Sequence, residues 1–364
     1  MITPHEVCLH LIPGIGPITA RILLQHFSTA ENIFKQTKQS LTHIDGIGEA
    51  TAQLLLKHQF YLKEADDLIR LTQKQNTQML FLGHDNYPSR LKQIPDAPLI
   101  LFRKGVDCLD LPRMISVVGT RKATDYGKRI TSQLIQDLQP WNPVIVSGLA
   151  YGIDIHAHRA ALQYGLSTVG VLAHGLDRLY PPTHYETAQK MIQDGALLTE
   201  YGWGKGPEPT WFASRNRIIA GLCDATIVVE AAEKGGALIT ASLANSYDRE
   251  VMAFPGRTDD AYSAGCHRLI QSHQAHLITS AQDIVELLCW DEENKKPIVR
   301  VIPKGLSDEQ IRILQLLIQN DDPHIDELCM SSGFTPQYLS LLLLELEMQG
   351  LIQGLPGKKY RCLI

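Results

Sequence analysis

Between residues 113 and 289, short runs rich in β-branched residues alternate with amphipathic segments. Apolar residues every three to four positions predict helices, and the short apolar runs predict buried strands. This alternation is typical of a parallel sheet with helices on both faces. Right-handed crossovers place the carboxyl ends of such strands, and any ligand crevice, at one edge. The predicted strands are 115–118, 144–147, 168–172, 196–199, 226–229 and 251–254.

Residues 1–75 show a different pattern, with short helices separated by glycines. LIPGIG at 11–16 and HIDGIG at 43–48 each precede apolar residues at helical spacing, which predicts a tight turn before a helix. The pair resembles a tandem helix-hairpin-helix unit, whose turn N–H groups can contact a backbone phosphate. The glycines can equally just join packed helices. Residues 1–60 carry four basic and four acidic residues, so we favour a helical accessory domain.

Three further segments complete the predicted organisation. Residues 76–289 are predicted to form an extended Rossmann-like domain, whose first part, residues 76–112, contains four prolines and is predicted to be a connector. Residues 290–305 are polar and predict an exposed linker. Residues 306–364 show three helical patterns and then a hairpin around residues 355–358, which is the outline of a winged helix.

The charge balance limits the kinds of surface that the protein can have. The 364 residues include 34 Lys and Arg against 39 Asp and Glu, a formal net charge of −5. By segment, the net charge is 0 for residues 1–60, −4 for 306–364 and therefore −1 for the residues between. A surface coated in basic residues is excluded, so any nucleic-acid site must be local.

The cysteines and the apolar runs predict a cytoplasmic protein without membrane contact. The seven cysteines are odd in number, scattered and without a CxxC pair, which is typical of reduced thiols. The amino-terminal sequence lacks a basic region followed by a sustained apolar stretch. The most apolar run, residues 339–346, is far shorter than the ~20 residues that a membrane span requires.

Glycine-rich segments follow several of the predicted strands, at residues 119–121, 147–154, 175–177 and 234–240. Glycine allows close backbone approach, and a helix that begins after such a loop directs its N–H groups at an anion. Because the carboxyl ends of parallel strands meet at one edge, these loops predict a phosphate-binding cleft there.

Cationic side chains accompany these loops. Each of them could be ordinary surface charge, but together they indicate an anion site, since guanidinium groups pair with phosphate in a bidentate manner. Trp211 and Phe212 can offer a stacking face for a base, or can belong to the core. The cations beside the loops are Arg121, Lys122, Arg215, Arg217 and Lys234.

Several alternative chemistries lack their signatures. No GxGxxG follows the first strand and no GxxxxGK[ST] occurs, which argues against hydride transfer and ATP hydrolysis. On a helix, His156 and His158 project from different faces, so no metal site is predicted. Asp154 is interpreted as a helix N-cap. Without a general base or a GxSxG elbow, we predict no catalytic residue and no cofactor.

Ordered motifs extend along nearly the whole chain. They are DNYP (85–88), IPDAP (94–98), VVGTRKATDYG (117–127), SGLAYGID (147–154), GLDRLYPP (175–182), RNRIIAGL (215–222), KGGALITA (234–241) and FPGR (254–257). On these motifs the chain resembles the DNA-processing protein A family, DprA or Smf. The resemblance implies an α/β fold, in which an extended Rossmann-like parallel sheet core lies between an N-terminal helix-hairpin-helix (SAM-like) domain and a C-terminal winged helix.

The resemblance also implies a function and its partners. The family binds single-stranded DNA, loads the RecA recombinase on it during natural transformation, and forms a homodimer through the Rossmann-like domain. It further implies a set of DNA-binding residues: Gly119, Thr120, Arg121, Lys122, Ser147, Gly148, Arg215, Asn216, Arg217, Lys234, Gly235, Gly236 and Thr240.

Three positions depart from the family pattern. His174 stands where a glycine is common, and Gly235 stands where a serine is common. Both could alter the shape or hydration of the pocket. Residues 272–275 (SHQA) replace a frequent Gly-Ala pair near the expected dimer region.

Two other functions are weighed against this interpretation. A nucleotide phosphoribohydrolase of the lysine-decarboxylase-like Rossmann type carries the motif PGGxGTxxE, but aligning Gly235 and Gly236 with it puts Ser242 at the catalytic Glu. The missing carboxylate argues against hydrolysis, so we expect a binding protein rather than an enzyme. A regulator specific for duplex DNA would have to use the acidic winged helix.

The predicted recognition helix, residues 336–349, contains no Lys or Arg and carries Glu345 and Glu347. A helix that reads the major groove normally presents Arg, Lys or Asn. We therefore interpret the winged helix as a protein-interaction or dimer-support module, in which only Lys358 and Lys359 of the wing could touch DNA.

Deletion of residues 306–364 should accordingly leave the affinity for single-stranded DNA largely intact, because the anion-binding loops lie elsewhere in the chain. The comparison is a binding titration of the truncated and the full-length protein with the same oligonucleotide. A large loss of affinity on truncation would contradict this interpretation.

Overall fold

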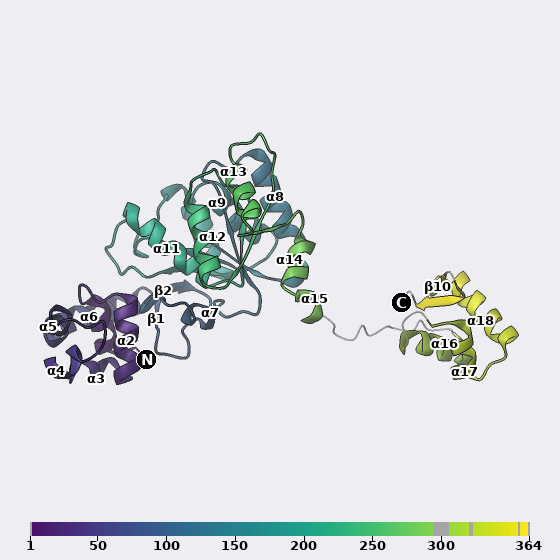
Figure 1. Cartoon of the computed structure of the whole chain (residues 1–364), viewed down its shortest axis with the longest axis horizontal. Helices are drawn as coiled ribbons and strands as arrows, with labels where there is room; N and C mark the ends of the chain where they lie inside the picture. Colours follow the sequence, from purple (N-terminus) through teal and green to yellow (C-terminus); the bar gives the residue numbers. More distant parts are fainter. Residues whose placement is uncertain (1, 294–305, 320–322, 356, 363–364) are drawn as a thin grey trace. The chain divides into compact units, whose positions relative to one another are not determined.

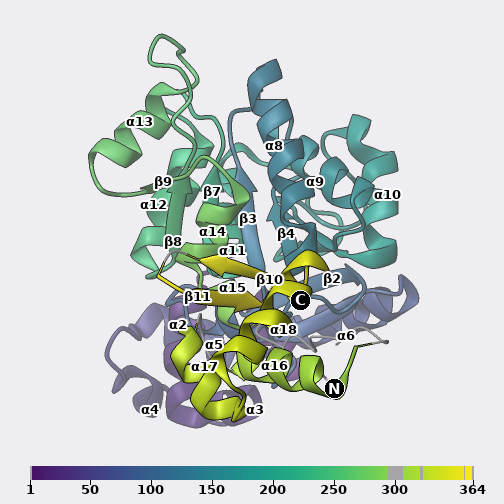
Figure 2. The same ribbon diagram turned by 90° about the vertical axis from the view of Figure 1, so that its right-hand side faces the viewer.

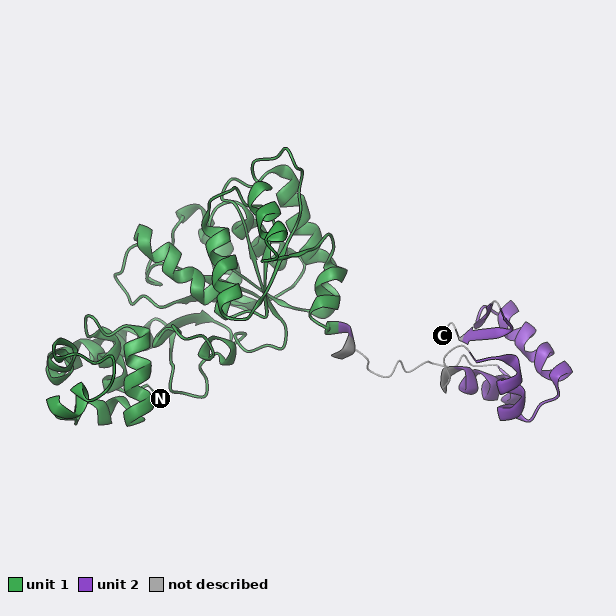
Figure 3. Cartoon of the chain, viewed as in Figure 1, with its two compact units in different colours: residues 1–290 green, residues 291–364 purple. Residues whose placement is uncertain are grey.

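The computed structural model of this protein describes residues 2–293, 306–319, 323–355 and 357–362 (Figure 1). The chain divides into two compact units, Met1–Trp290 and Asp291–Ile364 (Figure 3). No helix within the described ranges is long and apolar enough to cross a membrane.

A nine-stranded sheet forms the centre of the first unit, in the order β1-β2-β6-β5-β4-β3-β7-β8-β9. From β6 to β9 all neighbouring strands are parallel (Figure 2 shows β9, β8, β7, β3 and β4 in succession). The predicted parallel core is therefore confirmed, and each of the six predicted strands is found within one residue of its expected bounds. These strands are β3 (Met114–Val118), β4 (Val144–Ser147), β5 (Thr168–Val171), β6 (Ala196–Thr199), β7 (Ala225–Val228) and β8 (Glu250–Ala253).

Three strands were not predicted: β1 (Gln78–Phe81), β2 (Ile100–Gly105) and the short β9 (His276–Leu277). The first two lie in residues 76–112, for which the sequence predicted a proline-rich connector at the start of the domain and no strand. They pair with each other and with β6 in antiparallel fashion and extend the sheet. The four prolines that suggested a connector all lie outside these strands, because proline cannot donate to a strand ladder.

Helices cover both faces of the sheet. Alternate residues of a strand point to opposite faces, and Ile145 packs with one hydrophobic cluster while Val144 and Val146 pack with the other. On the Ile145 face lie α8 (Asp125–Asp137), α9 (Ile153–Gln163) and α14 (Ala281–Leu287). On the Val144 face lie α11 (Pro209–Gly221), α12 (Gly236–Ser246) and α13 (Ala264–Gln271). Further segments are α7 (Ser89–Lys92), α10 (Tyr185–Asp194), α15 (Trp290–Glu293) and the 3₁₀ turns Gln139–Trp141 and Pro182–His184.

The two Gly-Ile-Gly repeats of the amino-terminal region have the same conformation. The first glycine of each repeat, Gly14 or Gly46, has a positive φ of 81° or 88°. The second, Gly16 or Gly48, is the N-cap of the next helix, and the isoleucine between them is buried. The helices are α1 (Pro4–Leu11), α2 (Pro17–Phe27), α3 (Ala30–Phe34), α4 (Lys38–Thr42), α5 (Glu49–Leu56) and α6 (Gln59–Lys74).

These amino-terminal helices share a hydrophobic core with the sheet. Leu9 and Leu23 belong to the same buried cluster as Leu80 of β1 and Val146 of β4. Polar contacts add to this packing, since the Arg21 guanidinium donates to the Lys92 carbonyl at 2.9 Å. The helical region and the sheet consequently form one body.

The second unit has its own core, centred on Leu314, Leu328, Leu339 and Leu343. Three helices and a two-stranded antiparallel hairpin enclose it, in the arrangement of a winged helix. The predicted linker, residues 290–305, lies mostly outside the described residues. The elements are α16 (Asp308–Gln319), α17 (Ile325–Ser332), α18 (Pro336–Met348), β10 (Ile352–Leu355) and β11 (Lys359–Cys362).

The loops after β3 and β4 press directly against each other. Gly152 has a φ of +77°, and a Cβ atom there would lie 2.1 Å from the Thr120 carbonyl oxygen. Likewise, a Cβ at Gly119 would lie 2.4 Å from Cγ1 of Ile153. Only glycine at both positions allows these two loops to meet at the sheet edge.

Gly152→Ala should therefore lower the free energy of unfolding by about 3 kcal/mol or more, since it combines left-handed strain with a steric overlap. Gly165 is the matched control, because its φ is +71° but a Cβ there meets nothing within 4 Å. Gly165→Ala should cost only about 1 kcal/mol. Urea denaturation of both variants measures the difference, and equal losses would show that the loop contact is not tight.

Candidate nucleic-acid interface

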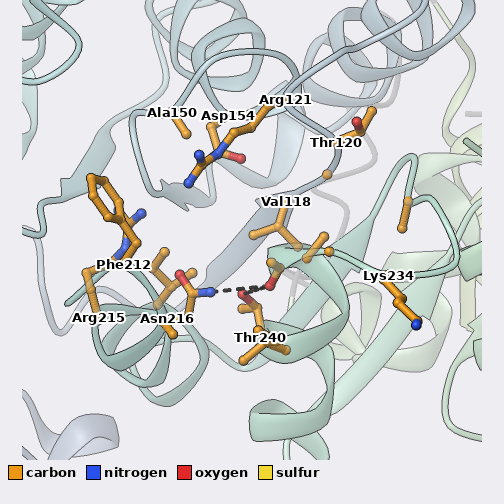
Figure 4. Close-up of a pocket in the computed structure, with 18 of the residues that line it drawn as sticks. Val118, Thr120, Arg121, Ala150, Asp154, Phe212, Arg215, Asn216, Lys234 and Thr240 are labelled. Carbon is orange, nitrogen blue, oxygen red and sulfur yellow. Dashed lines mark hydrogen bonds between the residues drawn. The ribbon is translucent and has the colours of Figure 1, made fainter. Parts of the chain in front are cut away.

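A cavity of about 330 Å³ lies at the carboxyl ends of β3 and β7 (Figure 4). Four segments form it: the loop after β3, the loop after β4 with the first turn of α9, helix α11, and the loop that leads into α12 with the first turns of that helix. The structure brings together nine of the thirteen residues predicted for the site. These are Gly119, Thr120, Arg121, Arg215, Asn216, Lys234, Gly235, Gly236 and Thr240.

The other four predicted residues do not line the cavity. Lys122 is exposed beside it, and its backbone N–H donates to the Thr120 hydroxyl at 3.1 Å. Ser147 is fully buried and donates to the Val117 carbonyl at 2.7 Å. Arg217 instead donates to the Glu200 carboxylate. Residues two apart on a helix point in different directions, so Arg215 and Arg217 of α11 cannot both face one cavity.

Two cations at the rim are available for a ligand. Arg121 and Lys234 are both exposed and line the cavity. Within the described part of the chain, no acidic side chain forms a hydrogen bond or an ion pair with either of them. In Figure 4 the two side chains lie on different sides of the cavity, Arg121 on the loop after β3 and Lys234 before α12. They can therefore contact phosphates at separate positions.

An aromatic surface adjoins the Arg121 side of the cavity. The Arg121 guanidinium carbon lies 5.5 Å from the centre of the Phe212 ring, in a cation–π arrangement. Phe212 in turn contacts the exposed Tyr180 edge-to-face, with ring centres 5.9 Å apart. Trp211 instead stacks on Tyr201 at 4.2 Å. Of the two aromatic residues considered in the sequence, only Phe212 lines the cavity.

Two buried groups of opposite charge, Arg215 and Asp154, lie at the base of the cavity. Arg215 is only 3% exposed and donates through Nη1 to the carbonyl oxygens of Gly148, at 2.7 Å, and Val171. A Cβ at Gly148 would lie 2.5 Å from that nitrogen, so glycine is needed there. Burial lowers the pKa of Arg215 to about 10, and the negative charge of Asp154 opposes this shift. Arg215 consequently stays protonated at neutral pH.

Asp154 compensates this buried charge and is not the N-cap that the sequence suggested. The N-cap of α9 is Gly152, and Asp154 lies in the first turn, where its carboxylate accepts the Gly148 N–H at 3.1 Å. Burial raises the pKa of Asp154, while the Arg215 charge lowers it. The prediction failed because Asp154 reaches back across the loop instead of bonding to its own helix end.

The amino terminus of α12 opens into the cavity. Its N-cap, Gly235, has no side chain to bond the first-turn N–H groups, and Gly236 and Ala237 both line the cavity. Asn216 Nδ2 and the Thr240 hydroxyl both donate to the Gly236 carbonyl, at 3.2 and 3.1 Å (dashed in Figure 4). These two hydrogen bonds hold the first turn of α12 in place. Its unpaired N–H groups lie at the cavity, where they can bind an anion.

Gly235 and His174, the two residues near the site that depart from the family pattern, differ in their surroundings. A Cβ at Gly235 would meet nothing within 4 Å, so the absent serine leaves open space at the cavity edge. His174 does not line the cavity. Its Nε2 accepts the Tyr180 N–H at 3.2 Å and its Nδ1 donates to the Gly175 carbonyl at 2.9 Å. It can therefore influence the site only through the loop that carries Tyr180.

The catalytic options of the site are limited. Asp154 is the one carboxylate among the described lining residues. The positive charge of Arg215 lowers the pKa of this carboxyl group and so makes it a weaker base. Burial raises the pKa of the Cys223 thiol, which makes it a poor nucleophile. Across the described ranges, no three His, Cys, Asp or Glu side chains converge so that they could hold a metal ion. The arrangement is suited to binding an anion.

Comparison with known proteins agrees with this architecture. A family model described as DNA recombination-mediator protein A matches residues 78–289. A model of the DprA winged helix domain matches residues 301–358, and a model of the SAM-like helix-hairpin-helix tandem matches residues 9–58.

Individual relatives match over large parts of the chain. Protein Smf of Synechocystis sp. is 31% identical and covers 96% of this chain and 96% of its own length. The X-ray structure of DNA processing protein A from Streptococcus pneumoniae matches with a TM-score of 0.68 and 36% identity, covering 78% of this chain and 98% of that chain. The Helicobacter pylori protein, whose structure is described by its single-stranded DNA binding mode, matches with a TM-score of 0.54 and 31% identity over 59% of this chain and 96% of that chain.

The fold and the site define an extended Rossmann-like protein that has a helix-hairpin-helix region at one end and a winged helix at the other. The matches to the core, the winged helix and the full-length relatives identify the particular group. The chain belongs to the DprA/Smf family of DNA-processing proteins.

Sequence reasoning missed Tyr180 and Ala150 as neighbours of the site. Ala150 lies within the motif SGLAYGID and lines the cavity, while Tyr180 lies in GLDRLYPP and contacts Phe212. Tyr180 could have been found from its position, because an aromatic residue in a loop that follows a strand can offer a surface on which a base stacks.

Arg215→Met should destabilise the protein by about 3–5 kcal/mol at pH 7, because it leaves the Asp154 carboxylate buried without its compensating cation. In this variant the pKa of folded Asp154 rises further above its unfolded value. The loss of stability caused by the buried carboxylate is absent below the pKa that Asp154 has in the unfolded chain. It grows as the pH rises from that value toward the pKa that Asp154 has in the folded protein. Acidification should therefore restore part of the lost stability.

Asp154→Asn is the control for this prediction. The double variant should be more stable at pH 7 than Arg215→Met alone, and its stability should lose the pH dependence that Asp154 causes. Urea unfolding between pH 5 and 8 measures both effects. If Arg215→Met shows the same loss at every pH, with or without Asp154→Asn, the attraction between these two charges is not what holds the loops.

Proposed function

We propose that this protein binds single-stranded DNA in the cavity at the carboxyl ends of β3 and β7 and mediates loading of a RecA recombinase during natural transformation. The observation that carries the proposal is that the uncapped start of α12 opens into a cavity that is also lined by the exposed cations Arg121 and Lys234. Backbone N–H groups and cations with no acidic partner are suited to phosphates of the DNA backbone.

The aromatic surface favours a single strand over a duplex. Phe212 and Tyr180 lie next to Arg121, and stacking on them requires an unpaired base. The site is also a recess of about 330 Å³, whereas reading a duplex through its major groove requires an element that enters the groove. A phosphate held by Arg121 would leave its attached base within reach of these rings.

Relatives support the same assignment. The Helicobacter pylori protein has a single-stranded DNA binding mode, and it is similar to this chain over 96% of its own length. On this basis Gly119, Thr120, Arg215 and Asn216 shape the binding surface, while Ser147 and Gly148 support it from below.

The proposal includes partners and a location. The resemblance in the ordered motifs supports a homodimer formed by the Rossmann-like domain and a RecA recombinase as the protein partner. The scattered cysteines support a reducing, cytoplasmic environment. The proposed role needs no catalytic residue or cofactor, because recombinase loading through binding alone breaks no covalent bond.

A nucleotide phosphoribohydrolase is the less supported alternative. The position that would supply its catalytic carboxylate is Ser242, and Asp154 of the cavity is held by Gly148 beside the Arg215 charge. Release of free base from nucleoside monophosphates would favour the enzyme, and absence of release alongside tight oligonucleotide binding favours the DNA-binding role.

Arg121→Ala and Lys234→Ala should each weaken binding to oligonucleotides of different sequence by a similar factor, roughly 10-fold, because each removes a phosphate contact. Each should also reduce the salt dependence, the slope of log K against log salt, by about 0.7. Lys190→Ala is the matched control, since Lys190 is exposed on α10 and does not line the cavity. Wild-type affinity and salt slope in both site variants would show that the DNA binds elsewhere.

A further inference from the structure

Helix α18 of the winged helix carries apolar side chains on both of its faces. Leu339, Leu342, Leu343 and Leu346 are buried and form part of the core of the second unit. Large apolar residues on the other side are exposed, which is unusual for a surface helix of a soluble unit. We call this set the α18 stripe: Tyr338 (42% exposed), Leu341 (50%), Leu344 (54%) and Met348 (82%).

The two acidic residues of α18 are used within their own unit. The Glu345 carboxylate accepts from Gln310 Nε2 of α16 at 2.9 Å. The Glu347 carboxylate accepts from the Gly354 N–H of β10 at 2.8 Å. These acids therefore position the helix against its neighbours. What α18 presents outward is mainly apolar, with no cation for a phosphate.

We propose that the α18 stripe pairs with the same stripe of a second copy of this chain, with the two helices antiparallel across a two-fold axis. Leu341, Leu344 and Met348 are spaced by three and then four residues, which is the seam of a two-helix coiled coil. A two-fold interface requires a surface that complements itself. The four side chains of the stripe are uncharged, and the one acid on the same side of the helix, Glu345, is hydrogen-bonded to Gln310.

Antiparallel pairing also suits the ends of the helix. It places Tyr338 of one copy near Met348 of the other, where a sulfur–aromatic contact can form. It also brings the acidic carboxyl-terminal half of each helix, with Glu345, beside the amino-terminal half of its partner. That half has no acidic residue and carries the positive end of the helix dipole.

The limited size of the stripe favours a second copy over an unrelated protein. Four partly exposed side chains offer roughly half of the ~800 Å² per partner that a standard stable interface buries. Such a seam is too small to hold independent molecules together but is sufficient between chains that are already joined, because tethering raises the local concentration to about the millimolar range. The inference therefore rests on the proposed homodimer of the Rossmann-like domain.

Cross-linking of the full-length chain tests the pairing. Cys289, Cys329 and Cys362 are replaced by serine, which leaves the buried thiols Cys8, Cys108, Cys223 and Cys266. Leu344→Cys is then compared with Gln315→Cys, an exposed control on α16, using a short bis-maleimide. We expect covalent dimers at least about 10-fold faster from Leu344→Cys, at a rate independent of protein concentration.

Second-site variants separate pairing from misfolding. Adding Leu341→Glu to Leu344→Cys should abolish the cross-link, because it puts two carboxylates at the seam, while adding Leu341→Met should preserve it. Sedimentation velocity and oligonucleotide binding are measured on the same proteins. Unchanged thermal unfolding of the Leu341→Glu variant shows that the winged helix itself is intact.

The outcomes distinguish this inference from the proposed function. If the protein is dimeric and binds single-stranded DNA but Leu344→Cys reacts no faster than Gln315→Cys, the pairing is wrong and the function stands. If it sediments as a monomer, the proposed dimer fails and the pairing fails with it, while the DNA-binding assay still reports on the cavity. If Leu341→Glu instead removes duplex binding without changing the cross-link, α18 contacts DNA and the pairing is overturned.

Discussion

The buried pair of Arg215 and Asp154 is the interaction on which the site depends. A guanidinium and a carboxylate taken out of water carry a large desolvation cost, which is offset only when their remaining donors and acceptors are used. Here Arg215 donates to the carbonyls of Gly148, just after β4, and of Val171, at the end of β5. Asp154 accepts the N–H of the same Gly148. The hydrogen bonds of these two side chains thereby tie together helix α11, two strand ends and the start of α9, and both side chains line the cavity.

This arrangement separates structural charge from binding charge. Arg215 and Arg217 both come from α11, but each is satisfied inside the protein, by carbonyls in one case and by Glu200 in the other. Arg121 and Lys234, at the rim, are exposed and have no such partners among the described side chains, so their charges are available to a ligand. The electrostatic field at the cavity is therefore local, which is how a protein with a formal net charge of −5 can present an anion site.

The sequence was sufficient for the parallel strands, because each is a continuous β-branched run bounded by turn residues, and for most of the cavity, because its loops follow those strands. Strands β1 and β2 escaped detection since the prolines between and beside them dominate the local pattern. The opposite directions of Arg215 and Arg217 follow from helix geometry and could have been foreseen. The burial of Ser147 and the reach of Asp154 back to Gly148 could not, because they depend on how two distant loops meet.

The shared core of the amino-terminal helices and the sheet has an evolutionary consequence. Leu9, Leu23 and Leu80 belong to one cluster with Val146, so exchanging the helical region for an unrelated module would expose part of the sheet to water. The winged helix, by contrast, buries its leucines against one another. Removal of the carboxyl-terminal module should thus leave the core of the sheet covered, whereas removal of the helix-hairpin-helix region requires compensating substitutions among the sheet residues that it covers.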